Sequence, residues 1–265
     1  MTNQSWNIDY KKKPNALMRL FCFHHSGGGA SVYFPWTELL LPHIELIAIQ
    51  LPGRENRFME PLTNDLQAII CRLTEEFRSY ADKPFLVFGH SLGALLSFEF
   101  IQSIYNPYSI FPIHMIVSAA RAPHLPFRRK YLSKLGDEDL KEELMIYNGI
   151  DERILHNNEL LDLFLPIIKN DFSISENYYS KNSKLFPFDI LALSGAQDPT
   201  VTQEEITSWS KYTNGKFEKL SFAGGHFYIK DHQKNIIDLI NKIAKNYSLK
   251  SDLATLKRTD RTWVG

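Results

Sequence analysis

Residues 84–98 have the sequence PFLVFGHSLGALLSF, in which a short apolar run meets a helical pattern at the pentapeptide GHSLG of residues 89–93. The run at 85–88 is typical of a buried strand, and residues 92–100 carry the apolar spacing of a helix. A strand that turns directly into a helix leaves no room for side chains beside the turn, which explains a glycine on each side of Ser91. The pattern predicts an exposed serine on a strained turn.

Strand-like and helical segments alternate on both sides of this turn. We expect strands at residues 17–23, 44–51, 85–88, 113–118, 188–193 and 217–222, and helices at 31–41, 64–80, 92–100, 203–212 and 231–246. Thr63 or Asn64 would cap the helix that begins at 64. This alternation predicts a doubly wound, mostly parallel α/β sheet whose site lies at the carboxyl ends of the strands.

One long interval interrupts the alternation. Between residues 125 and 184 there are only helical stretches, at 137–147 and 158–179, which we interpret as a helical lid over the open edge of the sheet. We therefore predict a single domain over residues 1–265. Its core would span about 16–124 and 185–248, and its ends would be polar tails at 1–15 and 249–265.

Composition limits the class of partner. The chain has 265 residues, 44% of them hydrophobic, which is enough for a full core. Lysine plus arginine and aspartate plus glutamate both number 30, so no net field would recruit nucleic acid or an anionic membrane. No apolar run approaches the roughly 20 residues of a membrane-spanning helix. Cys22 and Cys71 lie in apolar patterns and are predicted to be reduced core thiols of a cytoplasmic protein.

A serine hydroxyl is a weak nucleophile, so Ser91 requires a base and a group that orients the base. His226 follows the last predicted strand in the loop AGGHF, and Asp198 follows the strand at 188–193. Both lie at the carboxyl edge, whereas Asp189 begins its strand and Asp171 falls in the lid. The resulting chain order Ser, Asp, His is the order found in α/β-hydrolases.

Acyl transfer also needs backbone amides that stabilise a developing oxyanion. Leu92, the residue after the nucleophile, would supply one amide. The loop after the first strand, HHSGGGA at residues 24–30, would supply the other, and we assign it to Ser26.

Several segments together resemble one family. LFCFHHSGGGA at 20–30, QLPGRENR at 50–57, GHSLGA at 89–94, RAPH at 121–124, the lid segment 166–178 and GGHFY at 224–228 are similar to the stand-alone type II thioesterases that accompany nonribosomal peptide and polyketide synthetases. The resemblance covers roughly residues 17–245. The family usually has Pro where His24 stands and Ala where Ser26 stands. Because the oxyanion contact is made by backbone, Ser26 should preserve it.

The resemblance implies hydrolysis of aberrant or stalled acyl groups from the phosphopantetheine thiol of carrier proteins. The reaction of Ser91, His226 and Asp198 calls for no metal or organic cofactor, and we expect a monomer. Carrier proteins are typically acidic, and the arm carries a phosphate. We therefore expect basic residues at the rim of the site, namely Arg54, Arg57, Arg121, Arg128 and Arg129.

Two other functions use the same three side chains. One is a small-molecule esterase or lipase. The other is a chain-releasing thioesterase or acyltransferase, in which a nucleophile of the substrate replaces water. A binding-only relative would be expected to have lost one of Ser91, Asp198 and His226, and all three are present. The rate on a carrier-bound thioester against that on an aryl ester distinguishes the esterase from an enzyme that acts on carrier-bound acyl groups.

Overall fold

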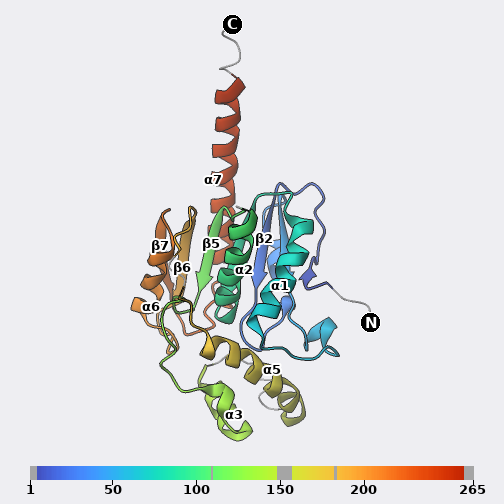
Figure 1. Cartoon of the computed structure of the whole chain (residues 1–265), viewed down its shortest axis with the longest axis vertical. Coiled ribbons are helices and arrows are strands. Elements are labelled where there is room, and N and C mark those ends of the chain that lie inside the picture. The colour runs from blue at the N-terminus through green and yellow to red at the C-terminus, as the bar shows by residue number, and fades with distance from the viewer. Residues whose placement is uncertain (1–4, 109, 148–156, 182–183, 260–265) are drawn as a thin grey trace.

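Figure 1 shows the computed structural model, which describes residues 5–108, 110–147, 157–181 and 184–259. Its centre is a seven-stranded sheet with the order β1-β3-β2-β4-β5-β6-β7. The pairing of β1 with β3 is antiparallel, and the other five pairings are parallel. The predicted doubly wound, mostly parallel α/β sheet is confirmed.

The parallel strands end at one edge of the sheet because their registers are nearly level. Phe23 pairs with Gly89, His90 with Ser118, and Gly195 with Phe222. Loops that leave these strands therefore start side by side. The strands are β1 (Asn7–Ile8), β2 (Met18–Phe23), β3 (Ile44–Ile49), β4 (Phe85–His90), β5 (His114–Ser118), β6 (Asp189–Gly195) and β7 (Phe217–Phe222).

Helices cover both faces of the sheet. Phe21 and Val87 belong to a core that includes apolar residues of α1 (Leu66–Phe77) and α2 (Leu92–Tyr108). Leu20 and Phe88 point the other way, into a core with η1 (Ala30–Glu38) and α7 (Gln233–Thr259). Each fully buried apolar side chain contributes roughly 1.5–3 kcal/mol, and burial on both faces explains why most residues of β2, β3 and β4 are apolar.

The expected helices are present, with some shifts in their ends. The segment predicted at 203–212 is α6 (Gln203–Thr207) followed by η5 (Ser208–Tyr212), and α1 is extended by η3 (Arg78–Tyr80). Asp65 caps α1 by accepting a hydrogen bond from the Ala68 amide at 3.0 Å. The predicted cap was wrong because the Thr63 hydroxyl instead accepts from the Asp65 amide.

Two helices lie beyond the carboxyl ends of the strands, where the arrows of Figure 1 point. They are α3 (Asp137–Tyr147) and α5 (Asn158–Asn177), close to the predicted helical stretches. With η4 (Leu132–Lys134) they bury a small core of their own, formed by Leu132, Leu140, Leu144, Leu161, Leu165 and Ile168. Residues 148–156 and 182–183 of the predicted lid lie outside the described residues, and the role of a lid stays a prediction.

The N-terminal segment is not simply a polar tail. Trp6 is buried, and Asn7 and Ile8 pair with Ile49 and Ala48 of β3. The Arg57 guanidinium lies over the Trp6 ring, 4.4 Å from its centroid. The buried Trp6 ring, the pairing with β3 and the hydrogen bonds that the Trp6 amide and Asn7 donate to Glu76 together hold this segment on the sheet edge. Residues 1–4 lie outside the described part.

Two further expectations are corrected. Helix α7 continues to Thr259, past the predicted end at 246 and into the predicted tail, because residues 249–259 contain good helix formers and neither Gly nor Pro. Residues 260–265 lie outside the described part. Cys22 is buried as expected, but Cys71 is exposed because it faces outward from α1.

Across the described residues, none of the helices is both long and apolar enough to cross a membrane.

Candidate active site

Ser91 occupies a tight turn between β4 and α2. Its backbone φ is +55°, in the left-handed region that side chains disfavour, and its amide donates to the Ser118 carbonyl at 2.8 Å. A Cβ at Gly89 would collide with the Gly93 carbonyl, and a Cβ at Gly93 would collide with the Phe23 carbonyl. The two glycines are therefore needed for close backbone approach, as the sequence predicted.

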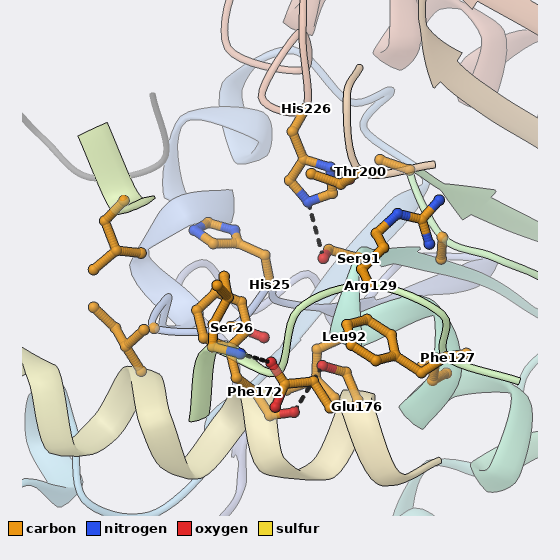
Figure 2. Close-up of a pocket in the computed structure, with 18 of the residues that line it drawn as sticks. His25, Ser26, Ser91, Leu92, Phe127, Arg129, Phe172, Glu176, Thr200 and His226 are labelled. Atoms are coloured by element: carbon orange, nitrogen blue, oxygen red, sulfur yellow. Dashed lines mark hydrogen bonds between the residues drawn. The ribbon is translucent and has the colours of Figure 1, made fainter. Parts of the chain in front are cut away.

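His226 lies in the loop that follows β7. Its Nε2 is 2.9 Å from Ser91 Oγ, as the dashed line in Figure 2 marks. The Gly224 amide donates to the Gln197 side-chain oxygen at 2.5 Å, and Gly224 has a φ of +109°. Glycine at this position lets the loop bend and bring the imidazole above the serine.

Asp198 follows β6 and contacts the other side of the same imidazole. Its Oδ2 is 2.8 Å from His226 Nδ1, and the Asp198 side chain has no exposed surface. With Nδ1–H donating to Asp198, Nε2 is left to accept a hydrogen bond from Ser91. The structure thus brings together the three side chains that the sequence selected.

Thr200 completes the surroundings of this carboxylate, and sequence reasoning missed it. Its amide and its hydroxyl both donate to Asp198 Oδ1, at 2.8 and 2.7 Å. The same hydroxyl is 2.7 Å from His226 Nδ1. The only signal in the sequence is the position of Thr200 two residues after Asp198, where a hydroxyl readily binds a preceding carboxylate.

The electrostatics keep Asp198 ionised. Burial acts to raise the pKa of Asp198, but the hydrogen bonds from His226 and Thr200 outweigh it and hold the pKa below its usual 3.8. The carboxylate therefore stays negative at neutral pH, and it fixes the proton of His226 on Nδ1.

A cavity of about 200 Å³ opens beside Ser91 and runs under the helices at the strand ends. Figure 2 shows Ser91 and His226 on one side of it and Phe172 and Glu176, from α5, on the other. Its wall is mainly apolar and includes Leu95, Phe127, Leu144, Phe164, Ile168 and Phe172. An apolar chamber beside a serine hydroxyl suits an acyl chain.

Both residues assigned to the oxyanion hole line this cavity. Ser26 lies in the loop after β2, and Leu92 is the first residue of α2. An amide at a helix start has no carbonyl within the helix to bind, and it lies at the positive end of the helix dipole. Their role as oxyanion donors stays a prediction.

Three of the expected rim arginines are buried in internal contacts. Arg54 pairs with Asp171, and Arg57 pairs with Glu60. Arg121 reaches the cavity wall, but its guanidinium donates to the carbonyls of Leu125, Ser175 and Tyr178. These three side chains hold loops together. Arg121 is among the residues that line the cavity and Arg54 and Arg57 are not, and a role in binding a carrier stays a prediction for all three.

The remaining two arginines are more exposed to solvent. Arg129 lines the cavity and forms an ion pair with Glu205 at 2.5 Å. Arg128 is exposed beside it. Docking of a partner on this side of the molecule stays a prediction.

Buried histidines surround the site. His24, His25 and His90 are at most 8% exposed. His90 Nδ1 binds the Ser118 hydroxyl at 2.8 Å, so His90 is directed away from Ser91, as expected. Burial, aided by nearby positive groups, lowers the pKa of His24 to about 4 and lowers the pKa values of His25 and His90 well below 6.5. All three are neutral at pH 7.

A parallel sheet with a serine on the turn after β4, an aspartate after β6 and a histidine after β7 defines an α/β-hydrolase. A family model described as the thioesterase domain matches residues 18–244. It leaves out only the two ends of the chain and includes the whole cavity wall.

Two named proteins and one solved structure are similar to this chain over about nine tenths of its length. The gramicidin S biosynthesis protein GrsT of Aneurinibacillus migulanus is 36% identical over 238 residues, which is 89% of this chain and 93% of that protein. The thioesterase PikA5 of Streptomyces venezuelae is 32% identical over 251 residues, covering 91% and 88%. The structure of the type II thioesterase BorB from the borrelidin biosynthetic cluster superposes with a TM-score of 0.83 at 33% identity, covering 91% and 99%. The chain belongs to the thioesterase family, among the type II thioesterases of nonribosomal peptide and polyketide clusters.

The histidine cluster predicts an acid-sensitive fold. In the unfolded chain His24, His25 and His90 take up protons near pH 6.5, whereas their folded pKa values are lower. The stability that these neutral imidazoles contribute is therefore fully present above pH 6.5. It is lost as the pH falls towards their pKa values in the folded protein, which is about 4 for His24. Urea unfolding should show a free energy of unfolding lower by roughly 1 kcal/mol per histidine at pH 5.5 than at pH 7.

His90→Asn provides the matched control, because Asn keeps a polar group near Ser118 but does not titrate. The free energy of unfolding of this variant should depend on pH less steeply, because unfolding takes up about one proton fewer. A stability that stays constant between pH 7 and 5.5 in the unaltered protein would contradict the neutral state of these imidazoles.

Proposed function

We propose that the chain hydrolyses aberrant or stalled acyl groups from the phosphopantetheine thiol of carrier proteins, with Ser91 as nucleophile, His226 as general base and Asp198 as its orienting group. The observation that carries the proposal is the unbroken contact chain from Ser91 Oγ to His226 Nε2 at 2.9 Å and from His226 Nδ1 to Asp198 at 2.8 Å, at the opening of an apolar cavity. Membership of the type II thioesterases supports the thioester as substrate.

Acylation would begin when Ser91 Oγ attacks the thioester carbonyl carbon and His226 Nε2 takes the hydroxyl proton. The carbonyl electrons move to oxygen, where the Leu92 and Ser26 amides would receive the charge. When the electrons return, the carbon–sulfur bond breaks and the acyl group stays on Ser91. An ordinary thiol has a pKa of about 8.5, so the sulfur leaves readily and takes the proton from His226.

Deacylation would repeat the steps with water as nucleophile. His226 takes a proton from water, the hydroxide attacks the acyl ester, and the proton returns to Ser91 Oγ as the acid leaves. Asp198 stays ionised throughout and stabilises the imidazolium in both halves.

The cavity limits the acyl group that fits. At about 200 Å³ it is somewhat larger than a cavity of about 150 Å³ that holds benzene in another protein. Short to medium acyl chains fit that volume, with the apolar side chains of α5 at the far end of the cavity.

A carrier protein would approach the opening of the cavity. Arg128 is exposed there, next to Arg129 and Lys130, which line the cavity. Arg129 and Lys130 already form ion pairs, with Glu205 and Glu143 respectively. We therefore assign the contact with an acidic carrier to Arg128 first.

The test compares acetyl-carrier protein with acetyl-pantetheine and an aryl acetate. We expect kcat/KM to be highest for the carrier-bound thioester, and Ser91→Ala to abolish turnover of all three. Arg128→Glu should raise KM for the carrier-bound substrate and leave acetyl-pantetheine unchanged, because only the carrier meets this surface.

Each other outcome argues against part of the proposal. Equal or faster turnover of the aryl acetate would indicate a general esterase. Transfer of the acetyl group to an added amine or alcohol in preference to water would indicate an acyltransferase. Turnover that survives in Ser91→Ala would contradict the mechanism.

Thr200 is proposed to position Asp198 within this machinery. Its two hydrogen bonds occupy Oδ1, which leaves Oδ2 for His226. Thr200→Val removes the hydroxyl at nearly constant shape and should lower kcat by about three- to tenfold, the value of one hydrogen bond, with KM nearly unchanged. Thr200→Ser keeps the hydroxyl and should behave like the unaltered enzyme. If Thr200→Val has full kcat, Thr200 does not position Asp198.

A further inference from the structure

A buried ion pair joins α5 to the loop that precedes η2 (Glu55–Arg57). Arg54 donates to both carboxylate oxygens of Asp171, from Nη1 to Oδ2 at 2.5 Å and from Nη2 to Oδ1 at 2.8 Å. The side chains are 4% and 0% exposed. Two parallel hydrogen bonds between charged groups fix the relative orientation of their backbones as well as their distance.

The same pair holds the loop after β2. Asp171 Oδ2 accepts the Gly27 amide at 2.8 Å, and Arg54 Nη1 donates to the Gly28 carbonyl at 3.1 Å. Gly27 has a φ of +74°, and a Cβ there would lie 2.7 Å from Ile168 Cγ1, one turn before Asp171 on α5. Helix α5 is therefore seated directly on this loop.

The far end of the loop is fixed as well. Gln50 accepts the Ala30 amide through its side-chain oxygen at 2.6 Å and donates to the Arg54 carbonyl at 3.1 Å. The segment between Ser26 and Ala30 is thus held by side chains from the residue that follows β3, from the turn at Arg54 and from α5. Only the last of these belongs to the region predicted to be a lid.

We propose that Asp171, held by Arg54, is a positioning residue for the oxyanion hole. By binding the Gly27 amide it fixes the orientation of the Ser26–Gly27 segment, and so aims the adjacent Ser26 amide at the carbonyl oxygen of the substrate. The inference rests on the proposed function, in which the Ser26 amide is an oxyanion donor. Because Asp171 belongs to α5, the oxyanion hole is complete only while α5 packs against this loop.

Stability alone does not explain this pair. A buried ion pair contributes little net stability, because the loss of hydration nearly cancels the attraction. Its hydrogen bonds are directional, however, and a displacement of about 1 Å in a positioned group can lower a rate on the order of a hundredfold.

The chain offers a matched control pair. Arg19 and Glu45 form a second ion pair with side chains 10% and 9% exposed, at 2.9 Å. They lie near the amino ends of β2 and β3, at the opposite edge of the sheet from Ser91. Loss of this pair should affect stability without affecting the oxyanion loop.

The experiment measures kcat and KM for acetyl-pantetheine hydrolysis in Asp171→Asn, Asp171→Leu and Glu45→Gln, at a temperature where each is folded by circular dichroism. Exchange of the Gly27 amide with deuterium is followed in the same samples. Asp171→Asn should lower kcat about tenfold or more with KM changed less than about twofold, since the oxyanion forms only in the transition state. Gly27 exchange should become faster, and Glu45→Gln should leave kcat and Gly27 exchange unchanged.

The outcomes distinguish failure of the positioning role of Asp171 from failure of the proposed function. A kcat in Asp171→Asn equal to that of Glu45→Gln, or a change confined to KM, overturns the positioning role. Asp171→Asn is decisive if the leucine variant does not fold, because Asn keeps one acceptor and nearly the same volume. Turnover that persists in Ser91→Ala would defeat the proposed function instead, whereas Ser91-dependent turnover that ignores Asp171→Asn defeats only this inference.

Discussion

The backbone at Ser91 is the constraint on which the site depends. A non-glycine residue with a φ of +55° costs on the order of 1–3 kcal/mol, and it persists only when its surroundings determine it. Ser91 lies between β4, which is paired with a strand on each side, and α2, which begins at the next residue. Glycines at 89 and 93 allow these backbones and that of the neighbouring strand β2 to approach closely. Burial of β4 and α2 offsets the strain and holds the serine hydroxyl at the open edge of the sheet.

The other groups reach Ser91 because neighbouring strands end at the same edge. Asp198 and His226 follow β6 and β7, and a Cβ at Gly195 would collide with the Gly225 carbonyl, so the two loops must touch. The loop after β2 arrives from the opposite side and is held by groups that lie far away in the chain, including Asp171 of α5. The sheet thus places one half of the site, and the helices over it place the other half.

The sequence predicted the parts of this arrangement that follow from local rules. Glycine spacing and apolar periodicity located the turn at Ser91 and the strands, and strand ends selected Asp198 and His226. Contacts between distant segments were not predictable in the same way. Asp171 was set aside because it lies in the lid, yet it meets Gly27 and Arg54. Arg54 and Arg57 were expected on the rim because an acidic carrier protein would meet basic residues there. Instead Asp171 holds Arg54 inside, and Glu60 and a tryptophan ring hold Arg57. Trp6, in a segment of polar composition, was missed for the same reason.

The central claim is that an acyl group passes through Ser91. Its most direct test is to quench the enzyme with acid during turnover of an acyl-pantetheine and to locate the acyl group by peptide mass spectrometry. The account predicts one acyl group per chain on the peptide that contains Ser91, lost on further incubation at neutral pH and absent in Ser91→Ala. Product formation without any acylated Ser91 peptide, or with the acyl group on another side chain, would contradict it.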